Sequence, residues 1–224
     1  MEKPQLKILA TKKLSVEQLW MFNKEINVTD TDFIDIRYNR LSPNLVKEPI
    51  DHVIITSKNA VEGLLFNFTP DELRFKNIYC VGRKTKALVE NKIDKVSHYE
   101  KYGEDLADYL VKNLKEKEVT FFCSDIRREE IPSILTKNGF SVNEVEVYRT
   151  VLKPKPYEEE FDAILFFSPS GVRSFVEMNT FGSSVAYCIG KTTAKEVKKY
   201  TKNVIISHTP LVESVIELVN KSYV

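Results

Sequence analysis

Several features are scarce in this sequence of 224 residues, and each absence excludes a class of protein. The chain has three cysteines, Cys80, Cys123 and Cys188, each within an apolar run. An odd number placed in this way argues against a disulfide-stapled secreted domain and indicates reduced, buried thiols. No segment reaches the roughly 18 uninterrupted apolar residues that a membrane span needs. We therefore expect neither a disulfide framework nor insertion into a membrane.

An excess of one charge is also missing. Lys and Arg number 33 and Asp and Glu number 32, so the formal net charge is +1. This balance gives no general electrostatic reason to expect nucleic acid as a partner. The first ten residues, MEKPQLKILA, lack the apolar core of a signal peptide. With the reduced cysteines, these features predict a cytoplasmic chain without a nucleic-acid or membrane partner.

Short apolar runs alternate with segments of helical spacing along the chain, in which 42% of the residues are hydrophobic. Such alternation predicts an α/β fold in which parallel strands are joined by crossover helices. The expected strands are 6–10, 53–56, 77–81, 95–97, 119–123, 163–167, 185–189 and 204–206. The expected helices are 16–26, with a buried face that includes Trp20, and 59–66, 85–91, 104–114, 129–138, 172–178, 193–200 and 210–221.

Part of this pattern occurs twice. Three landmarks at the ends of expected strands recur about 110 residues later: Ser57 and Ser168, Gly82 and Gly190, Ser97 and Ser207. Two homologous units are the simple explanation of the repeat. Because 161–224 supplies three strands, we expect the first strand of the chain to complete that sheet.

The repeat predicts two doubly wound parallel-sheet domains, of which the first is discontinuous. Domain A would comprise 1–36 plus 151–224, and domain B would comprise 39–148. Two segments that alternate apolar and polar residues, 32–38 and 146–152, would form a two-stranded ribbon that joins the domains.

The segment AILFFSPSGVRSFV, residues 163–176, combines a buried strand, a polar corner and the start of a helix. The segment HVIITSKNAVEGLL, residues 52–65, repeats this order. In open α/β sheets such corners bind ligands, because helix N-termini and loop amides lie beyond the carboxyl ends of the strands. We therefore expect ligand-binding groups at both corners.

Interpretations of single motifs as a nucleotide-binding loop, a nucleophile or catalytic histidines are less favoured. Gly190-Lys191-Thr192 is similar to the end of a nucleotide P-loop, but Val185 stands where that motif needs glycine. Ser168 lacks the G-x-S-x-G context of a nucleophile and is expected to cap a helix and bond a ligand. Gly190 is either a tight turn alone or a turn whose amides also bind a carboxylate. His98 and His208 are expected to be ordinary loop histidines.

Six segments together resemble uroporphyrinogen-III synthases: TSKNAV (56–61), YCVGRKT (79–85), FFCSDIRREEIP (121–132), VYRTV (147–151), FFSPSGV (166–172) and CIGKTTA (188–194). They span nearly the whole chain in the order and spacing of that family, whose members share the discontinuous two-domain layout. Two positions depart from the family pattern. Lys12 follows Thr11 where the family often has arginine, and Lys86 stands where it usually has alanine.

The resemblance implies a cofactor-free and metal-free enzyme of tetrapyrrole and haem biosynthesis. Such an enzyme converts hydroxymethylbilane, an anionic linear tetrapyrrole, into uroporphyrinogen III by closing the ring with inversion of ring D. The substrate would bind in the cleft between the domains of a monomer. The alternative is a non-catalytic, two-lobed protein that binds a small anion.

The resemblance also implies a set of site residues. Tyr148 would assist departure of the substrate's hydroxyl as an acid, unless it merely packs between the domains. Arg128 would bind substrate, unless it belongs to a solvated helix face. The expected binding groups are Thr11, Lys12, Ser57, Asn59, Gly82, Thr85, Ser124, Arg128, Ser168, Ser170, Gly171, Gly190, Thr192 and Thr193. Basic residues near the same corners would create a local positive field that the net charge conceals: Lys12, Lys58, Arg83, Lys84, Arg127, Arg128, Arg173 and Lys191.

Overall fold

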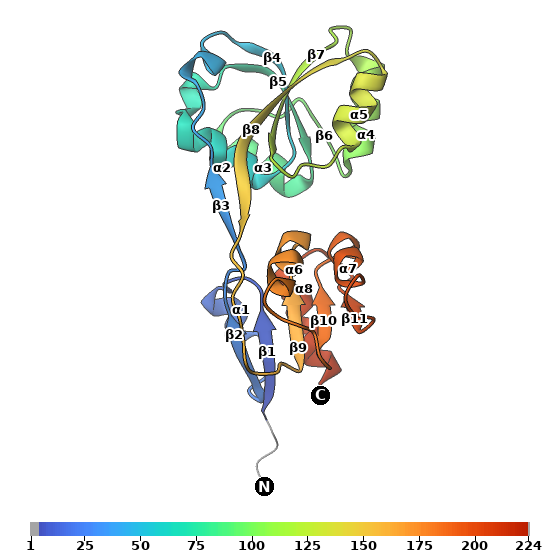
Figure 1. Cartoon of the computed structure of the whole chain (residues 1–224). Coiled ribbons are helices and arrows are strands. Elements are labelled where there is room, and N and C mark those ends of the chain that lie inside the picture. The colour runs from blue at the N-terminus through green and yellow to red at the C-terminus, as the bar shows by residue number, and fades with distance from the viewer. Residues whose placement is uncertain (1–4, 224) are drawn as a thin grey trace. The chain divides into compact units, whose positions relative to one another are not determined.

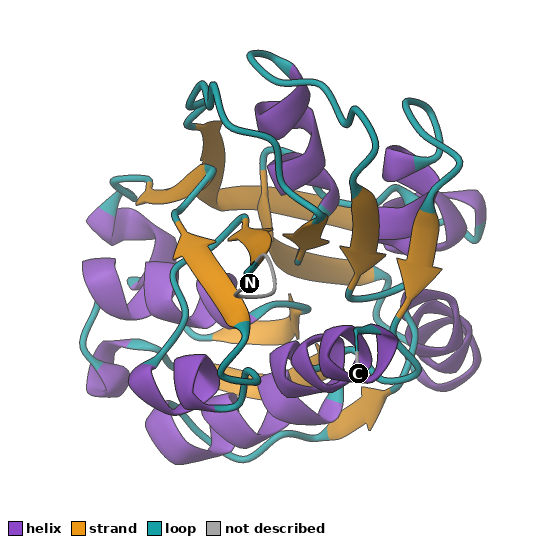
Figure 2. Cartoon of the chain, turned by 90° about the horizontal axis from the view of Figure 1, so that it is seen from below, coloured by secondary structure: helices purple, strands orange, loops and turns teal. Residues whose placement is uncertain are grey.

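The computed structural model describes residues 5–223, which divide into two units. Of the described residues, 5–35 and 151–223 form the split unit, and 36–150 form the continuous unit. Each unit contains one sheet with helices packed on both faces (Figures 1 and 2). The strands pair in parallel except at one edge, where 34–38 runs antiparallel to 141–152, as the hydrogen bonds from the Asn39 amide to the Val147 carbonyl and from the Lys153 amide to the Phe33 carbonyl show. The predicted α/β class is confirmed. Among the described residues, no helix is long and apolar enough to cross a membrane.

The sheet of the split unit has the order β11-β10-β9-β1-β2. Its strands are β1 (Leu6–Ala10), β2 (Ile26–Asp30), β9 (Ala163–Phe166), β10 (Val185–Cys188) and β11 (Val204–Ile206). The first strand of the chain pairs in parallel with β9, with Ala10 opposite Leu165, so it completes this sheet as predicted. One face packs on α6 (Pro169–Val176) and α7 (Lys191–Val197), and the other on α1 (Val16–Trp20) and α8 (Val212–Ser222).

The helix predicted over 16–26 is wrong beyond Trp20. Ser15 caps α1, accepting a hydrogen bond from the amide of Gln18 (N···O 3.3 Å). The helix then ends because Asn220 of α8 binds the next turn of chain, donating from Nδ2 to the carbonyl of Met21 (2.7 Å). Residues 26–30, INVTD, form the edge strand β2. Trp20, predicted to be buried, is 80% exposed.

The sheet of the continuous unit has the order β3-β8-β7-β4-β5-β6. Its strands are β3 (Ile34–Tyr38), β4 (Ile50–Ile55), β5 (Phe75–Val81), β6 (His98–Glu100), β7 (Glu118–Ser124) and β8 (Ser141–Leu152). One face packs on α2 (Lys58–Asn67) and α3 (Arg83–Lys92), and the other on α4 (Gly103–Asn113) and α5 (Glu130–Lys137), as Figure 1 shows. Two 3-10 turns, Pro43–Val46 and Pro70–Glu72, complete the unit.

The strand predicted at 95–97 lies three residues later, at β6. Ser97 precedes the strand and fixes its start, since its amide donates to the carbonyl of Ile78 and its hydroxyl accepts from the Ile78 amide. His98 then pairs with Tyr79 of β5, and its ring stacks on Tyr109 of α4 at a centroid distance of 3.5 Å. These contacts come from distant parts of the chain, so local composition did not predict them.

Glycine allows a close approach between α2 and β8. A Cβ atom on Gly63 would lie 2.8 Å from the carbonyl oxygen of Val147, closer than real Cβ contacts. The short separation brings the helix that follows Ser57 directly against the strand that carries Tyr148. Gly139 follows the end of α5 and has the positive φ of 81° that favours glycine at this position.

Each unit has its own apolar core, and this predicts that the continuous unit folds alone. A fragment of residues 36–150 contains both of its core clusters, whereas β1 and α1 need β9 and α8 as packing partners. We expect the fragment to unfold cooperatively in urea, as followed by circular dichroism. A fragment of residues 1–36 should show no cooperative transition. A broad, non-cooperative transition of 36–150 would contradict the prediction.

Candidate functional site

The strand order of each sheet reverses at one point. In the split unit the reversal lies between β1 and β9, and in the continuous unit it lies between β4 and β7. Open α/β sheets bind ligands beyond the carboxyl ends of the strands at such points. Thr11 and Ser168 follow β1 and β9, while Ser57 follows β4 and Ser124 ends β7. The main polar corners predicted from sequence therefore lie at the two reversal points.

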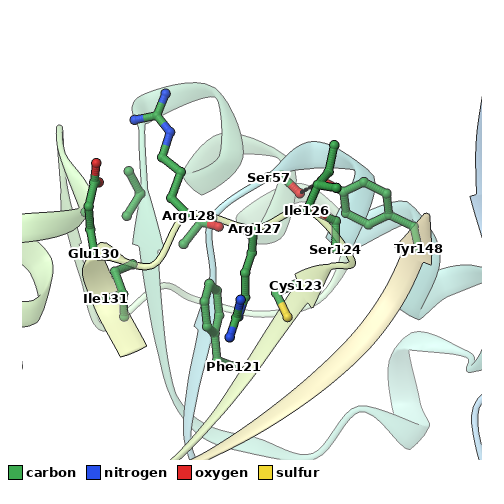
Figure 3. Close-up of a pocket in the computed structure, with 13 residues that line it drawn as sticks. Ser57, Phe121, Cys123, Ser124, Ile126, Arg127, Arg128, Glu130, Ile131 and Tyr148 are labelled. Carbon is green, nitrogen blue, oxygen red and sulfur yellow. Dashed lines mark hydrogen bonds between the residues drawn. The ribbon is translucent and has the colours of Figure 1, made fainter. Parts of the chain in front are cut away.

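A cavity of about 350 Å³ opens at the reversal point of the continuous unit (Figure 3). It contains four of the predicted site residues, Ser57, Ser124, Arg128 and Tyr148. The complete lining is Thr56, Ser57, Val81, Gly103, Phe121, Cys123, Ser124, Ile126, Arg127, Arg128, Glu130, Ile131 and Tyr148. Hydroxyl groups lie at the end beside Tyr148, and Glu130 and Ile131 lie at the other end (Figure 3).

A β-bulge directs Tyr148 into this cavity. Cys123 of β7 lies opposite Glu146, but the next residue, Ser124, lies opposite Tyr148, so β8 contains one extra residue here. Simple alternation would place Val147 and Tyr148 on opposite faces of the sheet, yet both are buried against the same core. Bulges commonly re-aim a side chain near a functional site in this way.

The Tyr148 phenol is held by Ser57, the N-cap residue of α2. The amide of Ala60 donates to Ser57 Oγ (3.0 Å), and the Ser57 hydroxyl donates to the phenol oxygen of Tyr148 (3.2 Å). Tyr148 is 9% exposed and also lines the cavity. The phenol is thus fixed by the helix start on one side and faces open space on the other.

The loop after β7 is fastened to β8 by Arg127. Its Nη2 donates to Glu144 Oε1 (2.8 Å), its Nε donates to Glu144 Oε2, and its Nη1 donates to Glu129 Oε1 (2.8 Å). The hydrogen bonds to Glu144 raise the pKa of Arg127 above its usual value. Asp125 adds a further link, since its amide donates to the carbonyl of Tyr148. Arg127 is therefore part of an ion-pair cluster, and its share of the predicted positive field is neutralised.

Sequence reasoning missed the apolar lining of the cavity. Phe121 and Ile131 are buried, whereas Ile126 is 50% exposed although its side chain is large and apolar. A single isoleucine between Asp125 and Arg127 in a polar loop was the available signal. The combination of apolar walls and convergent hydroxyls suits a ligand with flat hydrophobic rings and polar substituents.

The reversal point of the split unit brings together Thr11, Ser168 and Gly171. Thr11 Oγ1 donates to the carbonyl of Leu165 (2.8 Å), and the amide of Gly171 donates to Ser168 Oγ (3.0 Å). A Cβ atom on Gly171 would lie 3.4 Å from both hydroxyl oxygens, so the missing side chain leaves space beside them. This cluster and the start of α6 offer hydroxyls and amides to an anion.

Two basic side chains near this corner, Arg173 and Lys12, differ in how far their charges are already balanced by neighbouring residues. Arg173 donates from Nη2 to Ser170 Oγ (3.0 Å) and lies 3.9 Å from Glu196, which Lys199 also contacts. Its charge is therefore balanced in part, contrary to the expected positive field. Lys12 is half-buried, with its ammonium 5.9 Å from the centre of the Phe167 ring.

The other predicted residues lie at helix starts outside the lining of the cavity. Asn59 is on the first turn of α2, and Gly82 and the buried Thr85 begin α3. Gly190 precedes α7, where Thr192 is exposed and Thr193 is buried. The two repeated glycines differ in conformation, because Gly82 has a φ of 84° that favours glycine and Gly190 is extended.

The three thiols are poor nucleophiles, which predicts slow reaction with thiol reagents. All three cysteines are free and buried, and burial raises the pKa of each thiol to about 12. At pH 8 little thiolate is present, so we expect almost no reaction of the native protein with Ellman's reagent and three thiols titrated in denaturant. Because the raised pKa belongs to the folded state, stability should fall as the pH rises through the window from about 9 to 12. Rapid labelling of a native thiol at pH 8 would contradict this account.

Comparisons with protein families and with solved structures point to the same family. The family described as uroporphyrinogen-III synthase HemD matches residues 26–217. The fold is similar to a crystal structure of uroporphyrinogen-III synthetase from Helicobacter pylori, with a TM-score of 0.72, 19% identity, and coverage of 97% of this chain and 99% of that chain. A mutant uroporphyrinogen III synthase from Thermus thermophilus gives a TM-score of 0.67 at 12% identity, covering 97% and 98% of the two chains.

Proposed function

The chain belongs to the uroporphyrinogen-III synthase family, and from this premise we propose how its residues perform the family's reaction. That reaction closes hydroxymethylbilane into uroporphyrinogen III with inversion of ring D, a lyase step of porphyrin biosynthesis. Loss of the hydroxyl on ring A as water leaves an azafulvene cation. The substituted carbon of ring D attacks this cation to form a spiro intermediate, which opens and closes again at the other carbon.

We propose that Tyr148 assists departure of the hydroxyl as water. The observation that supports this role best is the orientation of its phenol, which Ser57 holds at the edge of the cavity. A positioned phenol can give a proton to a leaving hydroxyl or orient a water molecule. Ser124 lies opposite Tyr148 in the sheet and would bind the same part of the substrate.

The protein must also control the shape of the substrate, because unassisted closure gives the uninverted isomer. The apolar walls at Phe121, Ile126 and Ile131 would pack against pyrrole rings. Helix starts and hydroxyls would bind the acetate and propionate groups without burying charged side chains. We propose that Thr11, Ser168, Ser170 and Gly171 of the split unit also bind substrate. Lys12, Asn59, Gly82, Thr85, Arg128, Gly190, Thr192 and Thr193 would bind further carboxylates.

An isomer analysis tests the proposed function. The purified chain is given hydroxymethylbilane, the product is oxidised, and isomers I and III are separated chromatographically. We expect isomer III to predominate, whereas the control without protein should give isomer I. The alternative, a two-lobed protein that binds a small anion, predicts the same products with and without the chain. Isomer I alone in both samples would overturn the proposal.

We also propose that the chain acts as a cytoplasmic monomer without a nucleic-acid partner. The three reduced, buried cysteines support a reducing compartment, and the balanced charge offers no general attraction to nucleic acid. Light scattering at working concentration should give a mass near 25.9 kDa. A mass of twice that value would contradict the proposed monomer and indicate a dimer.

A further inference from the structure

We infer that Ser57 is a positioning residue for Tyr148, and that it directs the phenol proton into the cavity instead of binding the substrate itself. This inference rests on the proposed function, in which Tyr148 is the assisting acid. Its basis is a chain of two hydrogen bonds from the amide of Ala60 through Ser57 Oγ to the phenol oxygen of Tyr148.

The hydrogen-bond geometry sets the direction of this chain. Ser57 Oγ accepts from the Ala60 amide, so the serine's single hydrogen is available to donate, and it is directed to the phenol. Tyr148 then acts as the acceptor in that bond and keeps its own hydrogen. Among residues 5–223 the structure gives the phenol oxygen no other hydrogen-bond partner. The phenol hydrogen can therefore point to the cavity, where the leaving hydroxyl would lie.

The surroundings make this arrangement rigid. Ser57 is the N-cap of the ten-residue helix α2, and Gly63 lets this helix lie directly against Val147, the residue before Tyr148. On the other side, the bulge between β7 and β8 and the bond from the Asp125 amide fix the backbone of Tyr148. Bonds in such a chain polarise one another, and the positive end of α2 adds to this effect. The phenol is thus held in one orientation at the edge of the cavity.

Kinetics of Ser57→Gly and Ser57→Thr test the inference. Glycine is an accepted N-cap residue that lacks the hydroxyl, and threonine keeps the hydroxyl. We expect Ser57→Gly to lower the kcat for isomer III about tenfold with little change in KM, and Ser57→Thr to restore most of the rate. Ser15→Ala, which removes the cap of α1, is the matched control and should leave kcat unchanged. Circular dichroism should confirm that each variant is folded.

The deciding measurement is a double-mutant cycle with Tyr148→Phe. If Ser57 acts through the phenol, Ser57→Gly should have less than about a twofold effect once the phenol hydroxyl is gone. An equal loss in both backgrounds, or a rise in KM with kcat unchanged, would overturn the inference and make Ser57 a substrate-binding residue. These outcomes are distinct from failure of the proposed function, in which the wild-type chain itself would form no isomer III.

Discussion

Replacing Tyr148 by phenylalanine is expected to slow formation of isomer III about 100-fold, the lower end of the range for a general acid. The substrate is intrinsically reactive, so the phenol should assist and not be indispensable. Phenylalanine keeps the ring in the core cluster that contains Val147 and Val61, so the fold should survive. Initial rates of isomer III formation at saturating substrate measure the effect.

Tyr99→Phe is the matched control for this change. Tyr99 lies on β6, is 40% exposed and is outside the cavity lining. Loss of its hydroxyl should leave the rate unchanged. An unaltered rate for Tyr148→Phe would remove the phenol from the mechanism, and Tyr148 would then be a packing residue of β8.

Replacing Phe175 by alanine should lower the free energy of unfolding of the split unit by about 3–5 kcal/mol, the range for a buried phenylalanine. Phe175 is 2% exposed and contacts Phe33, Phe166 and Phe181 at centroid distances between 5.3 and 5.9 Å. Phe33 comes from the first part of the chain and the other rings lie within residues 166–181, and the cavity left by the side chain would lie between them. Urea denaturation followed by circular dichroism measures the loss.

Met178→Ala provides the comparison for Phe175→Ala. Met178 lies just after α6 and is 56% exposed, so its truncation should change the free energy of unfolding by less than about 0.5 kcal/mol. A loss below about 1 kcal/mol for Phe175→Ala would mean that the aromatic cluster does not hold the split unit together. Activity should fall along with stability, because Ser168 is the N-cap residue of α6, the helix that carries Phe175.

The sequence predicted the parallel sheets because each strand that is buried on both faces forms a short apolar run. The run before Ser168 and the first run of the chain are examples, and both strands lie where expected. The helix over 16–26 failed because Asn220, nearly 200 residues away in sequence, holds the turn that ends α1. Local spacing carries no information about such a partner.

The candidate site was predictable at its polar corners and less so in its details. Ser57 and Ser124, small polar residues at strand ends, line one cavity together with Tyr148, which only the family resemblance had indicated. The bulge that turns Tyr148 interrupts the alternation of β8 without any glycine to mark it. Arg127 was predicted to supply positive charge but binds Glu144, because the register of β7 and β8 brings that carboxylate close. Ion pairs of this kind depend on tertiary structure.

The ratio of isomer III to isomer I formed from hydroxymethylbilane tests this account most directly. With the wild-type chain in excess over substrate, the account predicts that almost all product is isomer III and that Tyr148→Phe shifts the ratio towards isomer I. A ratio that stays at the value of the protein-free control would contradict it.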